Sequence, residues 1–290
     1  MRAMSRSMNF VAAAVVFFAA ARGVQAQCSW VTVPTAMDFG TYDVFGGASN
    51  ATTATGAVRC TGNLDVTVSS TTGGAGIYNP RRMNATALYN VYIDAGRTLI
   101  WGNGTGGTFQ YAFTNTGGPN TYSGFAYGQV PGAQDLAPGA YNDSLTVTLA
   151  YRPSGGGAWT NLPGVAMPIR MTVVAACRAD TFTLTFPTYS PLSVAALPGS
   201  STVRVYCTRT TPATFALDNG ANASGVQKRM VNAGNFLLYT ATLASGSGTS
   251  TTSLAPIGSG IALNASIPAG QDIPAAAGSY LDTLQVVVNY

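Results

Sequence analysis

Short runs of alternating apolar and polar residues, separated by breaks rich in Gly, Pro and Asn, follow one another along the chain after about residue 26. In the run SLTVTLAY at 144–151, Leu145, Val147 and Leu149 alternate with Ser and Thr. Alternation with a period of two places the apolar side chains on one face of a β-strand. No later segment has the spacing of a helix, so the pattern predicts an all-β protein.

Short alternating strands between turn-forming residues are typical of antiparallel sandwiches, and their spacing here favours immunoglobulin-like domains. In the first half of the chain the predicted strands are 29–33, 57–69, 87–93, 108–113, 125–130, 144–151 and 167–174.

The chain contains two copies of one pattern. CSWVTVPTAMDFGTYDVF at 28–45 parallels CRADTFTLTFPTYSPLSV at 177–194, and AYNDSLTVTLAY at 140–151 parallels SYLDTLQVVVNY at 279–290. Each copy has the length of one domain. We therefore expect two immunoglobulin-like β-sandwich domains, at 27–174 and 175–290.

The two copies differ beyond their common last strand. The first copy continues through a turn-rich loop into one more strand at 167–174, whereas the second has no such strand. A sandwich without its last strand exposes an apolar groove that accepts a strand from another chain. The residues expected to line this groove are Phe182, Leu184, Phe186, Leu284, Val286, Val288 and Tyr290.

The first 26 residues (1–26) have the pattern of a secretory signal peptide. Arg2 and Arg6 precede an apolar run at 10–21, and VQA at 24–26 offers small residues for cleavage. The run is shorter than the roughly 18 residues of a membrane span. We expect an exported, soluble mature protein.

Loss of this segment removes Arg2, Arg6 and Arg22 from the 14 basic residues and leaves 11 against 10 acidic ones. The net charge then falls from +4 to +1. A nucleic-acid-binding surface needs a larger basic excess, so no nucleic-acid partner is expected.

Four cysteines remain, Cys28, Cys60, Cys177 and Cys207. In an exported protein they favour disulfides, and although three pairings are possible, the repeat selects Cys28–Cys60 and Cys177–Cys207. The absence of CxxC spacing disfavours zinc.

The chain has no His, which excludes Ser–His–Asp triads and histidine metal sites. Asp135 and Asp143 are close enough in sequence for a carboxylate pair. However, Asp143 recurs as Asp282 at the start of the same strand, where Asp commonly organises a turn. We predict no enzymatic activity, no cofactor and no metal site. Two basic pairs, Arg81–Arg82 and Lys228–Arg229, are expected to be solvated.

Four motifs resemble the spore coat U-like domain of archaic, Csu-type chaperone–usher pili: MDFGTYD at 37–43, LIWGNGTGGT at 99–108, FAYGQVP at 125–131 and PGAYNDSLTVTLAY at 138–151. The resemblance covers 27–151 closely. In the second copy it covers the Cys pair and the last strand, but ASGSGTSTTSL replaces the tryptophan motif.

This resemblance implies donor-strand complementation, in which the N-terminal extension of an adjacent pilin subunit fills the groove. A periplasmic pilus chaperone fills it before assembly, and an outer-membrane usher exchanges the partners. Only Gln27 separates the expected cleavage site from Cys28. The resemblance then implies a subunit that accepts a strand without supplying one, as the two-domain tip adhesin does, located outside the cell at the pilus tip.

Three Gly-rich loops, 71–80, 114–122 and 152–164, are expected to share the outer end of the N-terminal domain. Aromatic or apolar anchors on such loops suit contact with an abiotic or host surface. The same side chains could instead fold back onto the sandwich, and the sequence leaves both interpretations open. The anchors are Ile77, Tyr78, Tyr122 and Trp159, whereas Trp101, Val44 and Phe45 are expected to be structural.

Three functions remain in competition. The favoured one is a tip adhesin of a chaperone–usher pilus that promotes attachment and biofilm formation. The second is a structural subunit of such a pilus, or of a spore or surface coat, without an adhesive role. The third is a secreted sugar-binding module.

Overall fold

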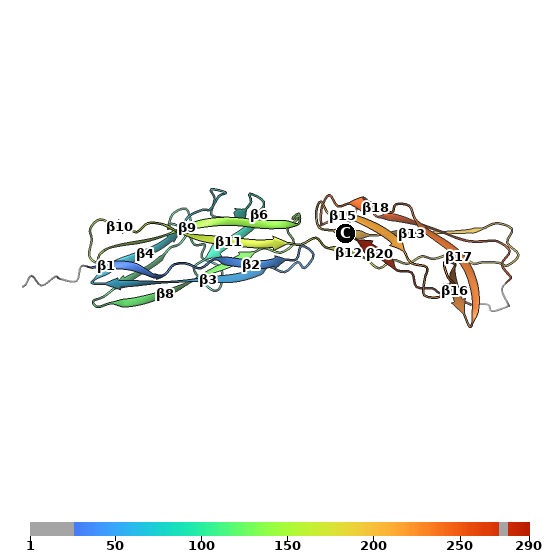
Figure 1. Ribbon diagram of the computed structural model, residues 1–290, viewed down its shortest axis with the longest axis horizontal. Coiled ribbons are helices and arrows are strands. Elements are labelled where there is room, and N and C mark those ends of the chain that lie inside the picture. Colours follow the sequence, from blue (N-terminus) through green and yellow to red (C-terminus); the bar gives the residue numbers. More distant parts are fainter. Residues whose placement is uncertain (1–25, 273–277) are drawn as a thin grey trace, which may run out of the picture.

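The computed structural model describes residues 26–272 and 278–290, which fold into two β-sandwiches lying end to end (Figure 1). Strands β1 to β11 form the first sandwich and β12 to β20 the second. The described residues contain no helix, so the predicted all-β class is confirmed. The predicted signal peptide lies outside the described residues, apart from Ala26.

The first sandwich consists of two sheets. One has the order β1-β3-β8-β6-β5, and the other has the order β2-β11-β9-β4-β7, with β10 paired to β9. The strands are β1 (Gln27–Thr32), β2 (Met37–Tyr42), β3 (Asn50–Thr61), β4 (Leu64–Ser70), β5 (Arg81–Met83), β6 (Ala87–Tyr92), β7 (Tyr111–Asn115), β8 (Asn120–Val130), β9 (Gly139–Pro153), β10 (Thr160–Asn161) and β11 (Val165–Val173).

The second sandwich has smaller sheets. Their orders are β13-β19-β17-β16, β18-β15-β20 and β12-β14. The strands are β12 (Cys177–Ala179), β13 (Leu197–Val203), β14 (Val205–Cys207), β15 (Pro212–Leu217), β16 (Lys228–Asn232), β17 (Asn235–Leu243), β18 (Ser247–Thr249), β19 (Ile261–Ile267) and β20 (Val286–Asn289).

Both predicted disulfides are present. Cys28 and Cys60 are bonded across the β1–β3 pair, and Cys177 and Cys207 across the β12–β14 pair. Each bond closes a loop of about 30 residues, which the chain-entropy model values at roughly 3–4 kcal/mol of stability. The first strand of each sandwich is therefore covalently fastened to the strand beside it.

The repeat extends to side-chain contacts. We call residues at the same place in the two copies twins. Tyr42 accepts a hydrogen bond on its hydroxyl from the backbone N–H of Gln134 at 2.9 Å, and its twin Tyr189 accepts one from Gln271 at 2.8 Å. Two copies that bury the same hydrogen bond share one folding pattern, as the sequence predicted.

The predicted strand 57–69 is in fact two strands in different sheets. β3 ends at Thr61 and β4 begins at Leu64, and the chain crosses from one sheet to the other at Gly62, where φ is +84°. A positive φ suits glycine, which allows the sharp bend between the sheets. Continuous alternation of apolar residues on both sides of this turn concealed the reversal.

The expectation that the basic pairs are solvated is wrong for their first members. Arg81 is fully buried and donates from Nη2 to the hydroxyl of Ser70 and to the carbonyls of Thr71 and Trp101. Burial lowers the pKa of this guanidinium. Its twin Lys228 is also buried and donates to the carbonyl of Asp218. Carbonyl groups inside the sandwich accept from both cations, although Nε and Nη1 of Arg81 have no partner among the described residues. Local sequence does not reveal these contacts.

Candidate strand-acceptor groove and surface loops

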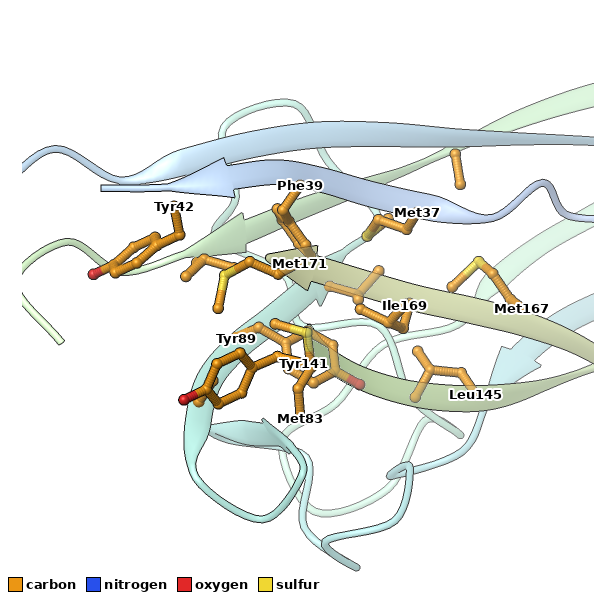
Figure 2. Close-up of a cluster of buried hydrophobic side chains, with 14 of the residues drawn as sticks. Met37, Phe39, Tyr42, Met83, Tyr89, Tyr141, Leu145, Met167, Ile169 and Met171 are labelled. Atoms are coloured by element: carbon orange, nitrogen blue, oxygen red, sulfur yellow. The ribbon is translucent and has the colours of Figure 1, made fainter. Parts of the chain in front are cut away.

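Strand β11 completes the first sandwich. It lies between β9, to which it is antiparallel over nine residue pairs from Val165↔Val147 to Val173↔Gly139, and β2, to which it is parallel. Figure 2 shows its side chains in one buried cluster with Leu145 of the neighbouring β9 and Tyr89 of the opposite sheet. The inward residues Met167, Ile169, Met171 and Val173 are all fully buried.

The burial of these four side chains is a large part of this sandwich's stability. A fully buried aliphatic side chain contributes about 1.5–3 kcal/mol relative to an exposed one. The neighbouring strand is buried as well, because Leu145 and Val147 of β9, which pair with β11, have no solvent-exposed surface. The second sandwich allows a direct comparison, because it contains the twin of β9 but not the same neighbouring strand.

In the second sandwich the twin of β9 is β20, and it is an edge strand. It pairs with β15, and among the described residues no strand lies against its other edge. Leu284, Val286 and Val288, the twins of Leu145, Val147 and Leu149, are only half-buried. These residues are therefore more exposed than their twins, on an edge where the described residues place no counterpart of β11.

The opposite wall of the groove is unpaired too. Leu184 and Phe186 are the twins of Met37 and Phe39 in β2, the strand that pairs with β11 in the first sandwich. In the second copy this segment forms no strand and makes only an isolated bridge between Thr185 and Ser200. Among the described residues of the second sandwich, β20 and the segment around Leu184 and Phe186 are therefore unpaired on the sides where their twins pair with β11.

The structure brings six of the seven predicted groove residues together around the second core. Tyr290 is the exception, because 61% of it is exposed and it is not part of that cluster. The six that pack against the buried core are Phe182, Leu184, Phe186, Leu284, Val286 and Val288.

A buried hydrogen bond anchors one end of the groove wall. The hydroxyl of Tyr239 donates to Oδ2 of Asp282 at 2.6 Å, and the backbone N–H of Asn222 donates to Oδ1 at 3.0 Å. Burial, followed by the bond to this carboxylate, raises the pKa of Tyr239. The ring of Phe186 meets Tyr239 edge-on at 6.1 Å. This cluster fixes both walls without help from a donor strand.

Trp159 is the anchor predicted on the 152–164 loop, and the structure leaves it exposed. It is 41% exposed, and the Arg152 guanidinium lies 4.7 Å from the centre of its ring. Ile77 is similarly exposed. Tyr78 instead folds back, donating its hydroxyl to the carbonyl of Ser70 at 3.1 Å and lying beside Arg81.

Tyr122 is not on a loop, and that prediction is wrong. It belongs to β8, pairs with Val58, and lies at 4.2 Å between ring centres from Phe113. Its hydroxyl donates to the side-chain carbonyl of Asn115 at 3.0 Å. The strand begins at Asn120, earlier than the Gly-Pro break suggested, and the ring therefore points between the sheets.

The three predicted loops do not share one end of the sandwich. Gly62 donates to the carbonyl of Gly117 and Ser154 donates to the carbonyl of Asn63, which gathers 114–122, 152–164 and the β3–β4 turn at one pole. The remaining loop, 71–80, lies instead beside the middle of β9.

The contacts of loop 71–80 fix that position. Thr71 donates to the carbonyl of Thr146 and Gly74 donates to Asp143. At about 3.3 Å per residue, Asp143 is roughly 30 Å along β9 from Pro153. The unrecognised bend at Gly62 explains the error, because it carries the chain into the other sheet and reverses the direction of the strand that leads into this loop.

Residues that sequence reasoning missed form the junction between the sandwiches. Asp135 accepts hydrogen bonds from the backbone N–H of Ser253 at 2.8 Å and from its hydroxyl at 2.6 Å. Burial raises the pKa of this carboxyl, but the bonds from Ser253 outweigh it and leave the pKa below its usual value. The guanidinium of Arg178 lies 5.6 Å from the ring centre of Phe45.

Within the described ranges no three His, Cys, Asp or Glu side chains gather as metal ligands would. Nor does this part of the chain contain a helix long and apolar enough to cross a membrane.

Comparison with known proteins adds a family and a fold. The model of a family described as Spore Coat Protein U domain matches residues 14–148 and 165–287. No curated protein matches the chain.

Among solved structures, the chain is similar to a chain in the crystal structure of the CsuC–CsuE chaperone–tip adhesion subunit pre-assembly complex from archaic chaperone–usher Csu pili of Acinetobacter baumannii. The identity is 20%, the TM-score is 0.51, and the match covers 91% of this chain and 100% of that one. This similarity establishes a shared fold.

A second match is to a structure described as a chaperone–tip adhesin complex of CFA/I fimbriae biogenesis, with 12% identity and a TM-score of 0.26. It covers 90% of this chain and 83% of that one.

Proposed function

The chain belongs to the Spore Coat Protein U domain family, and from this premise we propose that it is a subunit of a chaperone–usher pilus whose second sandwich accepts a donor strand. One observation carries the proposal. Leu284 and Val286 are half-buried, whereas their twins Leu145 and Val147, which pair with β11, have no exposed surface. A strand that enters the groove would bury them and pair with both open edges.

β11 is the template for the strand that would enter. The donor runs antiparallel to β20, begins opposite Val286, the twin of Val147, and extends over about nine residues. Its alternate side chains are as large and apolar as those of Met167, Ile169 and Met171, because they fill the same place between two sheets. β11 leads from the first sandwich into the second, and a donor in the same direction would lead into the next subunit (Figure 1).

The partners follow from this mechanism. An adjacent pilin subunit supplies the donor strand in the fibre. A periplasmic chaperone covers the groove after export, since an apolar groove beside unpaired edges promotes aggregation. An outer-membrane usher then exchanges chaperone for pilin, and the protein reaches the cell surface as part of the pilus.

We further propose that the first sandwich is the outward, adhesive domain at the tip. β11 closes it from within the chain, so it needs no donor from another subunit. Trp159 lies on a loop at the pole away from the second sandwich, with much of its indole ring exposed. Exposed aromatic and apolar side chains at such a pole suit attachment to an abiotic or host surface and the growth of a biofilm.

The groove is tested by completing it artificially. A copy of residues 152–174 is appended after Tyr290, the twin of Tyr151, so that the loop and strand that close the first sandwich also close the second. We expect a clear rise in the thermal midpoint of the second sandwich and loss of binding to the chaperone. The matched control carries Ile169→Asp in the appended copy only, and we expect no rise. If both appended chains melt like the original, the groove does not accept a strand.

The tip position is tested by electron microscopy of pili that carry an epitope tag within the glycine run at 155–157. Label confined to fibre ends supports the tip, and label along the shaft supports the alternative of a structural pilus or coat subunit. Trp159→Ala pili that attach to plastic as well as the original would remove the adhesive role from this loop.

A further inference from the structure

The first sandwich contains a cavity between its two sheets, over a patch of small residues on one of them. On β3 and β8, Ala54 is paired with Ala126 and Gly56 with Gly124. Four small residues in two adjacent cross-strand pairs leave the inner face of this sheet without side chains large enough to reach the other sheet. The result is an open-sided cavity of about 250 Å³.

The cavity separates two parts of the hydrophobic core. The larger core cluster lies around Met37, Tyr89 and Ile169, and a smaller one surrounds the Cys28–Cys60 disulfide. The lining is apolar and rich in aromatic rings, among them Trp30, Trp101, Tyr111, Phe113 and Tyr122. A close-packed sandwich would place one continuous core here, so the gap is a property of this sequence.

One residue of the lining has a polar atom without a partner. The indole Nε1 of Trp30 is shielded from solvent and has no hydrogen-bond acceptor among the described residues. By contrast, the indole Nε1 of Trp101 donates to the carbonyl of Val68 at 3.1 Å. A buried N–H without an acceptor is unfavourable, and a ligand bearing an acceptor would satisfy it once the Trp30 ring turns towards the cavity.

We propose that this cavity is a binding site for a small apolar molecule, an aromatic ring or short acyl chain that carries one hydrogen-bond acceptor for Trp30. An apolar cavity of about 150 Å³ is large enough to hold benzene, so this one accommodates a substituted ring. The aromatic walls pack against the ligand's ring. The Trp30 indole turns towards the cavity as the ligand enters, and a ketone or ester oxygen of the ligand then accepts from Nε1. The site is on the side of the first sandwich, and it is independent of the second sandwich and its groove.

Two probes of equal size test the proposal. Acetophenone carries a carbonyl, and ethylbenzene has the same ring without an acceptor. Binding to the full chain is followed through the indole N–H resonances of Trp30, Trp101 and Trp159 by NMR. We expect acetophenone to shift the Trp30 resonance most and to bind at least tenfold more tightly than ethylbenzene, and Trp30→Phe to abolish that preference.

A cavity-filling variant provides the structural control. A Cβ at Gly124 would meet no atom within 4 Å, so Gly124→Leu fills the cavity without a clash at its first atom. Gly118→Leu makes the same change at a position with equal free space on the 116–119 loop. We expect Gly124→Leu to weaken acetophenone binding at least tenfold and Gly118→Leu to leave it unchanged. Equal binding by both variants, or no binding to the original chain at millimolar acetophenone, would overturn the proposal.

Discussion

Tyr239 donates its hydroxyl hydrogen to Asp282 at 2.6 Å, as its twin Tyr89 does to Asp143 at 2.5 Å. The bond joins β17 to the segment that leads into β20, and so it fixes the groove wall to the opposite sheet. Because the bond is made in the absence of a donor strand, the groove is prepared before a partner arrives. Its geometry is built into both copies by the same two residue types.

Tyr239→Phe tests the energetic role of this bond. The ring still packs against Phe186, but the half-buried carboxylate of Asp282 loses one donor. We expect a loss of about 1.5–3 kcal/mol in the free energy of unfolding, the usual value of a hydrogen bond to a charged group. Urea denaturation measures the loss, and Tyr290→Phe, at an exposed tyrosine on the same wall, is expected to change it by less than about 0.5 kcal/mol.

Gly220→Ala should damage the same anchor by a different route. A Cβ at Gly220 would lie 2.1 Å from Oδ2 of Asp282, where φ is already +88°. Gly225 has a positive φ as well, but a Cβ there meets no atom within 4 Å. Both substitutions carry the left-handed penalty of about 1 kcal/mol, so the difference in unfolding free energy between them isolates the clash. We expect Gly220→Ala to be the more destabilising, and equal losses would contradict this placement of Asp282.

β11 offers two neighbouring positions with opposite environments. Met171 points into the core and is buried, whereas Thr172 beside it is exposed. Met171→Asp places an unpaired carboxylate inside the first sandwich, and we expect a loss of about 3–5 kcal/mol or failure to fold. Thr172→Asp should be tolerated. Differential scanning calorimetry of the full chain separates the outcomes, and similar melting of the two variants would mean that β11 does not complete the core.

These comparisons show which features the sequence could predict. The alternation of apolar and polar residues, repeated at 144–151 and 283–290, was enough to predict the fold class, the duplication and the groove wall. Strand periodicity is a local property of the sequence. The reversal at Gly62 was missed, since apolar alternation continues through it. The burial of Arg81 depends on carbonyls from distant segments, and the cavity depends on which small residues are paired side by side on β3 and β8. The pairing register of β3 and β8 is set by the folded structure, and the local sequence does not reveal it.

Acid should loosen the junction between the sandwiches. Since the folded pKa of Asp135 is lowered, its contribution is complete above the unfolded value of about 3.9 and is lost as pH falls through the folded value. Small-angle X-ray scattering should therefore show greater variation in the separation of the sandwiches below about pH 4 than at pH 7. Asp135→Asn has no carboxylate to protonate at this position. If that variant shows the same acid response as the original chain, another group controls the junction.

The junction within the chain also predicts how the next subunit docks. Phe45 follows the hydroxyl-bonded Tyr42 by three residues and faces Arg178 of the second sandwich. Leu192 follows the twin Tyr189 by the same spacing; it is 91% exposed, and Val194 beside it is 99% exposed. Apolar side chains so exposed, at the twin of an existing interface, suit a contact with the subunit that supplies the donor strand.

Leu192→Ser tests that contact against Val226→Ser, a control in which 86% of the original side chain is exposed on a different loop. Neither substitution removes a packed side chain, so we expect the unfolding free energy of the free chain to change by less than about 0.5 kcal/mol in both. Only Leu192→Ser should weaken the complex with the adjacent pilin, measured by analytical ultracentrifugation of the two subunits together. The apolar contact of one leucine is worth about 1.5–3 kcal/mol, which corresponds to at least a tenfold loss of affinity. Equal affinities for the two variants would show that the twin of the internal junction is not used between subunits.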